Sequence, residues 1–414
     1  MNAGATELFV VTPPGLEGVT EREVREILAH HGFEGATAQV TRLAGGIRLT
    51  GDQRMMATLL LHLSTASRVL VRVGRFKARG FPELERRVKS VALEDVLGDG
   101  RPVRLEVTSR KSRLYHTGAI EERIRRILDL PDGESEPVET TGRSQPRLGP
   151  DGDRDREGGE GDDDGDVSES GALRLVVRVH RDEFTLSADA SGVGLHRRGY
   201  RLAIAKAPMR ETLAAALLRE SGWVPGLPLA DPFCGSGTLP IEAARMARRI
   251  PAGMGRGFDA ERWPNANPEV WAAVREQALQ GILPESPAPL VGSDRDAGAI
   301  EAAKANAVRA GVENDIAFSV AAFSDAPVPA GAWVLMNPPY GHRISGGDLR
   351  NLYARLGDKL RDWRAAGIAL VTDQPEMLQH ARVNTQARFH TSNGGIDIAA
   401  VSSSGPVPGS PEDD

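Results

Sequence analysis

Short runs of apolar residues mark the strands and helices of the first part of the chain. The run Glu7–Thr12, ended by two prolines and a glycine, predicts a strand. A helix is expected over Thr20–His30, strands over Thr37–Leu43 and Gly46–Leu49 around a glycine turn, and an apolar helix over Gln53–Leu63. This order predicts a small α+β unit of ferredoxin-like form over residues 1–66.

The next run of elements predicts a second α+β unit over residues 67–190. Strands are expected at Ser67–Phe76 and Arg101–Ser109, helices at Phe81–Val91 and Gly118–Leu128, and a hairpin at Leu173–Asp182 and Glu183–Asp189. Residues 131–171 are almost free of apolar side chains and predict a disordered acidic insertion. Residues 405–414 are expected to form a disordered tail.

From about residue 201 strands and helices alternate, which predicts a parallel, doubly wound sheet in a domain over residues 191–404. Phe258–Pro284 is expected to be an inserted excursion. The expected strands are Leu227–Ala230, Leu290–Ser293, Ile316–Val320, Trp333–Met336 and Ala369–Val371.

Composition places the chain among cytoplasmic proteins with no membrane span. No run of about 18 apolar residues occurs, and the N-terminus lacks the pattern of a signal peptide. The single cysteine, Cys234, allows neither an internal disulfide nor a multi-thiolate zinc site, so no metal is expected. Cys234 could serve as a nucleophile, but small residues suit the glycine-rich loop in which it lies.

Charge is divided unevenly along the chain. The formal net charge is −6, but residues 131–171 hold 14 Asp and Glu against 4 Lys and Arg. Residues 1–130 hold 21 basic against 16 acidic residues. A mildly basic folded body beside a separate acidic segment permits binding to a nucleic acid without demanding it.

The most informative local motif is a strand that runs through a glycine turn into a helix, Leu229–Thr238. Gly235 and Gly237 let the backbone approach a ligand closely, and the following helix offers unpaired N–H groups. The carboxylate of Asp231 can form an ion pair with an ammonium group of a ligand. The motif therefore favours a ligand with both a carboxylate and an amine, and it lacks the spacing of dinucleotide or P-loop sites.

Two further motifs follow at the ends of later strands. Asp294, one βαβ unit after the glycine loop, is placed to bind ribose hydroxyls, and Asp296 could do so or cap the next helix. The third motif is Asn337-Pro338-Pro339-Tyr340. The Asn337 amide oxygen and the Pro338 carbonyl can accept both hydrogens of one amino group, while Tyr340 can stack on a base.

Together these motifs resemble the class I S-adenosylmethionine-dependent methyltransferases that act on amino groups. The segments Lys111–Ala119, Leu186–Arg201 and Ala207–Ala214 extend the resemblance to THUMP-domain guanine methyltransferases, most closely the bacterial enzymes for 23S rRNA. The match covers nearly the whole chain except 131–171 and the tail. It implies a Rossmann-like methyltransferase domain preceded by ferredoxin-like and THUMP modules, which bind structured RNA.

The resemblance also implies residue roles. Asn337, Pro338 and Tyr340 would hold the target guanine, and Ala207–Ala214 would close the pocket. The cofactor S-adenosylmethionine would be bound by Asp231, Phe233, Gly235, Ser236, Gly237, Thr238, Asp294, Asp296 and Asn337. RNA phosphates would meet Arg110, Lys111, Arg113, Arg197, Arg198 and Arg201.

One departure affects the cofactor site. The family usually has an Asp for the adenine amino group after the third strand, where this chain has Ala322, with Asp325 three residues later. The expected function is methylation of a guanine 2-amino group in 23S rRNA. The alternatives are a tRNA guanine methyltransferase, a DNA adenine methyltransferase, a protein glutamine methyltransferase, and a non-catalytic RNA-binding protein with a decayed methyltransferase domain.

Overall fold

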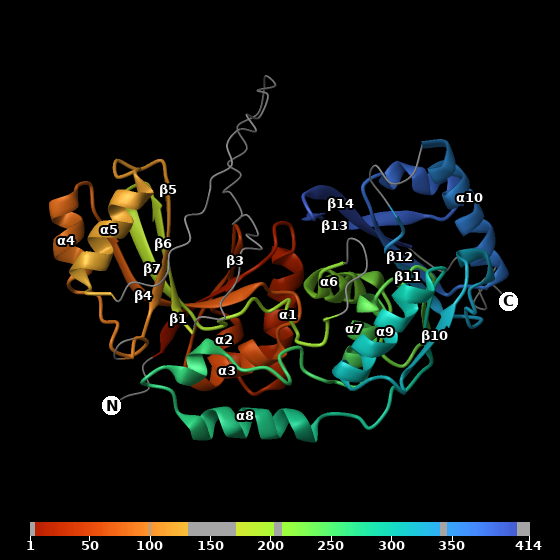
Figure 1. Ribbon diagram of the computed structural model, residues 1–414, viewed down its shortest axis with the longest axis horizontal. Helices are drawn as coiled ribbons and strands as arrows, with labels where there is room; N and C mark the ends of the chain where they lie inside the picture. The colour runs from red at the N-terminus through yellow and green to blue at the C-terminus, as the bar shows by residue number, and fades with distance from the viewer. Residues whose placement is uncertain (1–4, 99–100, 131–170, 203–208, 340–345, 404–414) are drawn as a thin grey trace.

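The computed structural model describes residues 5–98, 101–130, 171–202, 209–339 and 346–403, except the side chains of 346–348. Two seven-stranded mixed sheets build the molecule, one from each half of the chain (Figure 1). The predicted fold class, an α/β methyltransferase-type domain behind an α+β front half, is confirmed. The acidic segment, the tail and Tyr340 lie outside the described residues.

The first sheet begins as a ferredoxin-like unit with strand order β2-β3-β1-β4. Apolar side chains of β1, β3 and α3 form its core, including Leu8, Val10, Ile47, Leu59 and Leu60. Its elements are β1 (Thr6–Val11), α1 (Glu17–His30), α2 (Glu34–Thr37), β2 (Thr41–Leu43), β3 (Gly46–Gly51), α3 (Gln53–His62) and β4 (Arg68–Lys77).

The strand predicted over Thr37–Leu43 is only partly correct. The structure has the short helix α2 first, and β2 starts at Thr41. Arg25 explains the difference, because its guanidinium donates to the carbonyls of Thr37 at 2.6 Å and Val40 at 3.0 Å. Those carbonyls are therefore bound to α1 and not to a neighbouring strand.

The same sheet continues through β4 into the second unit, in the order β4-β7-β6-β5. β4 pairs with β1 in its first half and with β7 over most of its length. The predicted division at residue 66 thus falls before the strand that completes the ferredoxin-like unit. The added elements are α4 (Phe81–Val88), β5 (Val103–Arg110), α5 (Thr117–Ile127), β6 (Leu173–His180) and β7 (Glu183–Asp189).

The second sheet has the order β10-β9-β8-β11-β12-β14-β13, in which β14 and β13 are antiparallel. The five parallel strands match the predicted ones closely. They are β8 (Leu229–Asp231), β9 (Leu290–Asp294), β10 (Ile316–Val320), β11 (Trp333–Met336) and β12 (Gly367–Thr372), and the unpredicted hairpin is β13 (Thr385–Asn393) and β14 (Ile396–Ser403). The helices are α6 (Glu211–Ser221), α7 (Thr238–Ala247), α8 (Pro268–Gln280), α9 (Ala297–Ala310) and α10 (Gly346–Asp362).

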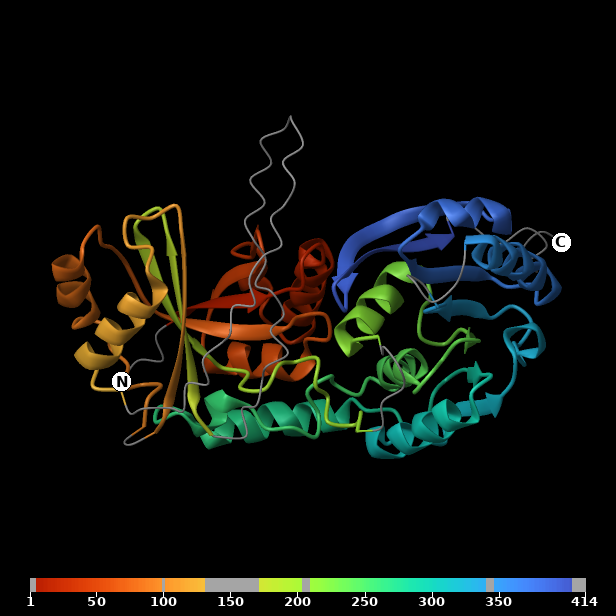
Figure 2. The same cartoon turned by 45° about the horizontal axis from the view of Figure 1, so that its top comes forward.

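The predicted excursion, Phe258–Pro284, belongs to the second half of the chain but packs against the first half. α8 runs beneath the ferredoxin-like unit beside α3 in both views (Figure 2). Its buried side chains Trp271 and Val274 belong to the apolar core of the first sheet, together with Phe258 and Trp263. The excursion therefore joins the two halves by hydrophobic burial.

Candidate functional site

Three neighbouring parallel strands bring the predicted motifs to one edge of the second sheet. β8 pairs with β9 on one side and with β11 on the other, so Asp231, Asp294 and Asn337 follow adjacent strands at their carboxyl ends. Ligands of open α/β sheets bind at this edge.

The glycine loop between β8 and α7 is tightly held. Gly235 and Gly237 have φ of +52° and +84°, which other residues adopt at a cost. A Cβ on Gly237 would lie 3.0 Å from Ala303 Cβ, so α9 packs directly on the loop. The buried Asn306 of α9 donates to the Ser236 carbonyl at 3.0 Å, which fixes the turn before Thr238 starts α7.

Asp231 is buried at the end of β8, and its Oδ1 accepts from the Phe233 amide at 3.0 Å. Burial raises its pKa to about 8, and the nearby charge of Asp294 adds to this, against the opposing effect of that amide hydrogen bond. A cationic ligand would relieve the cost of ionising this carboxyl.

Asp294 ties the loop to β9. Its Oδ2 accepts from the Gly235 amide and its Oδ1 from the Asp296 amide, both at 3.0 Å. Asp296 caps α9 by accepting from the amides of Gly298 and Ala299. The structure thus shows the capping role that the sequence left open for Asp296.

Asn337, directly after β11, has a side-chain oxygen that can accept a hydrogen bond. Its Oδ1 is buried and has no hydrogen-bond partner among the described residues. Pro338 beside it is buried as well. A buried polar atom without a partner costs free energy, so this oxygen is suited to accept a hydrogen from a ligand.

The sequence interpretation missed two residues that the structure singles out, Phe323 and Glu211. Phe323, just after β10, stacks on Phe233 with ring centroids 5.2 Å apart, and an aromatic residue directly after the third strand was the available signal. Glu211 at the start of α6 is buried, and burial raises its pKa to about 7. Ala322 has no side-chain carboxyl and Asp325 is exposed, so neither supplies a buried carboxyl at this position.

The predicted RNA-binding residues divide into two groups. Arg110, Lys111, Arg113 and Arg197 are exposed. The prediction that Arg198 binds RNA is wrong. This residue is 4% exposed and its side chain donates to the carbonyls of Leu195 and Ser64, and Glu242 lies 3.7 Å away. Arg198 cannot contact an RNA phosphate, because its side chain is buried inside the protein.

Arg201 is also used internally. Its Nη1 donates to the Met209 carbonyl at 2.8 Å, and its Nε lies 3.1 Å from Glu211. Cys234 is buried, and burial raises the pKa of its thiol, which opposes a nucleophilic role. Within the described residues no cluster of three or more His, Cys, Asp or Glu is arranged to bind a metal, and none of the helices could cross a bilayer.

Comparison with known proteins identifies the family. The model described as "RMKL-like, methyltransferase domain" matches residues 198–401, and "RlmL ferredoxin-like domain" matches residues 7–70. A Synechocystis protein named "Putative RNA methyltransferase slr0064" is 30% identical, covering 94% of each chain. The chain belongs to the RMKL-like methyltransferase family. Its members are S-adenosylmethionine-dependent enzymes, so the predicted cofactor is confirmed.

Solved structures agree with this RMKL-like fold. A Listeria monocytogenes protein, described as a "predicted N6-adenine-specific DNA methylase", is 30% identical over 96% of each chain with a TM-score of 0.76. The structure of "SMU.472, a putative methyltransferase complexed with SAH" is 24% identical, with a TM-score of 0.78, and covers 98% of this chain and 99% of that one.

Proposed function

We propose that this RMKL-like methyltransferase methylates the exocyclic 2-amino group of a guanine in RNA, with 23S rRNA as the substrate. The observation that carries the proposal is the buried Asn337 Oδ1, which has no partner among the described residues and lies at the strand edge beside the glycine loop. The printed name of the Synechocystis relative supports RNA as the substrate. A tRNA guanine remains the alternative within the same chemistry.

The residues around the glycine loop fit S-adenosylmethionine. Gly235 leaves open space for its methionine end, and Gly237 would line that end through its backbone. Asp231 would meet its ammonium group, and the start of α7 would meet its carboxylate. Asp294 would bind ribose. The remaining lining would come from Phe233, Ser236 and Thr238, while Phe323 offers an aromatic face for adenine where the usual Asp is replaced by Ala322. The bound cofactor supplies an electrophilic methyl group on sulfonium.

Asn337 would prepare the amino group for attack. An aryl amine is a weak nucleophile because its lone pair is delocalised into the ring. Asn337 Oδ1 and the Pro338 carbonyl would accept its two hydrogens, which favours a tetrahedral nitrogen and directs the lone pair away from the two acceptors. Positioning of this kind accounts for much of the rate in group transfer. Tyr340, which we propose stacks on the base, lies outside the described residues.

The front half would bind the RNA in the cytoplasm. We assign residues 67–190 to a THUMP domain, in which Arg110 at the end of β5 and the following Lys111 and Arg113 form an exposed basic segment. Together with the exposed Arg197, these residues would contact phosphates and make binding fall as salt rises.

One observation favours a second candidate, a DNA adenine N6-methyltransferase. The Listeria relative carries that description, and Asn337 could hold the N6 amino group of adenine in the same way. Mass spectrometry of nucleosides from a deletion strain separates these candidates. We expect loss of N2-methylguanosine from rRNA. Its loss from tRNA would select the alternative substrate, and loss only of N6-methyladenine from DNA would contradict the proposal.

The role of Asn337 is tested by Asn337→Ala. We expect kcat to fall by about 100-fold or more, the scale for removing one group that acts in the transition state, while calorimetry with S-adenosylhomocysteine still shows binding. The exposed Asn314 provides the matched control, Asn314→Ala, which should retain full activity. Wild-type turnover by Asn337→Ala would refute the assigned role. No cofactor binding by the wild-type protein would favour the non-catalytic alternative.

A further inference from the structure

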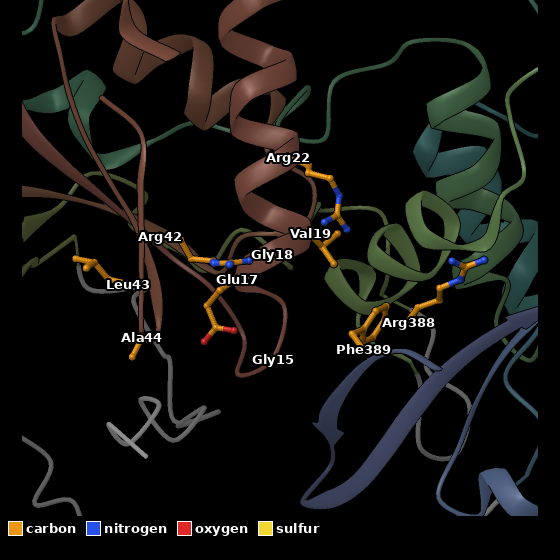
Figure 3. A pocket seen from close by; sticks show the side chains of 10 residues that line it. All are labelled: Gly15, Glu17, Gly18, Val19, Arg22, Arg42, Leu43, Ala44, Arg388 and Phe389. Carbon is orange, nitrogen blue, oxygen red and sulfur yellow. The ribbon is translucent and has the colours of Figure 1, made fainter. Parts of the chain in front are cut away.

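A cavity of about 590 Å³ opens where the two halves of the molecule meet, far from the glycine loop in sequence (Figure 3). One wall is the first turn of α1 with the turn between β2 and β3. The opposite wall is β13, through Arg388 and Phe389. The cavity therefore has walls from both sheets.

Close backbone packing holds the two walls in place. A Cβ on Gly15 would lie 1.8 Å from the His390 carbonyl oxygen, so the chain before α1 touches β13 directly. Leu16 and Val19 belong to the same buried apolar cluster as Phe389. The walls cannot separate without exposing this cluster to water.

Two arginines converge inside this cavity. A Cβ on Gly18 would lie 3.1 Å from Nη1 of Arg42 and 3.8 Å from Nη1 of Arg22, so both guanidinium groups lie against Gly18. Their side chains are 58% and 56% exposed. An anion placed beside two like positive charges is attracted to both of them.

Among the lining residues three arginines, Arg22, Arg42 and Arg388, outnumber the one acidic residue, Glu17. The acidic partners of Arg22 and Arg42, Glu220 and Glu21, are not among the lining residues. Glu17 lines the cavity, but its Oε1 accepts from the Gly45 amide at 3.1 Å. The Arg388 guanidinium points away from the cavity in Figure 3, and its Nε donates to Ser402.

We propose that this cavity binds a phosphate of the RNA backbone, with Arg22 and Arg42 as its ligands. The inference rests on the proposed function, in which RNA is the substrate. Guanidinium groups match phosphate oxygens through paired N–H donors, and such contacts fix the position of a nucleic acid without reading its sequence. Because both halves of the molecule form the cavity, a phosphate held there is fixed relative to the catalytic edge of the second sheet.

The test is filter binding of transcribed 23S rRNA and of a tRNA pool at several salt concentrations between about 50 and 200 mM. We expect Arg22→Ala and Arg42→Ala each to weaken RNA binding several-fold. Each should also reduce the slope of log affinity against log salt by about 1, the value for one lost phosphate contact. Binding of S-adenosylhomocysteine, measured by calorimetry, should not change.

Two control variants separate phosphate binding from a structural role. Glu220→Gln breaks the ion pair of Arg22 but keeps its guanidinium, so it should bind RNA as well as wild type or better. If Arg22 only joined α1 to α6, Glu220→Gln would lose RNA affinity together with Arg22→Ala. Arg355→Ala removes an exposed charge on α10 and should not reproduce the effect.

The proposal is overturned if both arginine variants bind RNA with wild-type affinity and salt slope, if Arg355→Ala weakens binding equally, or if the wild-type protein binds neither RNA. Failure of the proposed function looks different. In that case the arginine variants still lose RNA affinity, but the deletion strain retains N2-methylguanosine in both rRNA and tRNA.

Discussion

At the scale of single residues, Asp231 links the cofactor site to the stability of the fold. Its pKa of about 8 in the folded protein lies above the ordinary value of 3.8, so the folded state binds the proton more tightly than the unfolded state does. This contribution to stability is complete below about pH 4 and is lost as pH rises to about 8. The loss reaches up to about 1.4 kcal/mol per pH unit.

Urea unfolding at pH 6 and pH 8 measures this effect. Wild-type protein should be less stable at pH 8, and Asp231→Asn should flatten the dependence because the amide does not ionise. Some slope should persist in the variant, since the buried Glu211, with a pKa raised to about 7, acts in the same direction. An identical slope in wild type and variant would show that Asp231 is already ionised at pH 6.

At the scale of elements, the loop before α1 depends on a glycine. Gly15 has φ of +84°, and a Cβ there would overlap the His390 carbonyl of β13. Gly32 supplies a matched comparison, because it has φ of +79° but open space around it. Gly32→Ala should therefore cost about 1 kcal/mol for the backbone conformation alone, and Gly15→Ala clearly more. Equal melting temperatures for the two variants would contradict the close packing.

Elements with strong local patterns were predictable from the sequence, and those defined by distant partners were not. The apolar runs of β10 and β11 predicted these strands at their exact bounds. β11 is a central, largely buried parallel strand, and in the edge strand β10 the buried Ile316 begins the run. β13 was missed because most of its side chains are exposed and polar. Arg198 was misassigned because Glu242 and the Ser64 carbonyl, which bind it, lie far away in sequence. The burial of the Asn337 oxygen, without a partner in the described part of the chain, likewise became evident only in three dimensions.

At the scale of the whole molecule, Glu23 joins the two halves. It lies on α1, is fully buried, and accepts hydrogen bonds from the amides of Ser64 and Thr65 and from both of their hydroxyls. Arg219 of α6, in the other half, lies 3.1 Å away. Burial alone would raise the pKa of Glu23, but Arg219 and these hydrogen bonds outweigh it and lower the pKa. Its stabilising effect is therefore present above about pH 4.5 and is lost as pH falls.

Glu23→Gln should loosen the contact between the halves. Removing one partner of a buried ion pair costs up to about 3–5 kcal/mol, and Arg219 would then keep only its exposed pair with Glu26. Calorimetry should show a lower melting temperature and a broadened or divided transition, since the front half would unfold more independently. Glu26 is the matched control: it also pairs with Arg219, at 2.7 Å, but is 63% exposed, so Glu26→Gln should cost at most about 1 kcal/mol. If Glu23→Gln melts in one transition at the wild-type temperature, the burial of α8 in the first core holds the halves together without this ion pair.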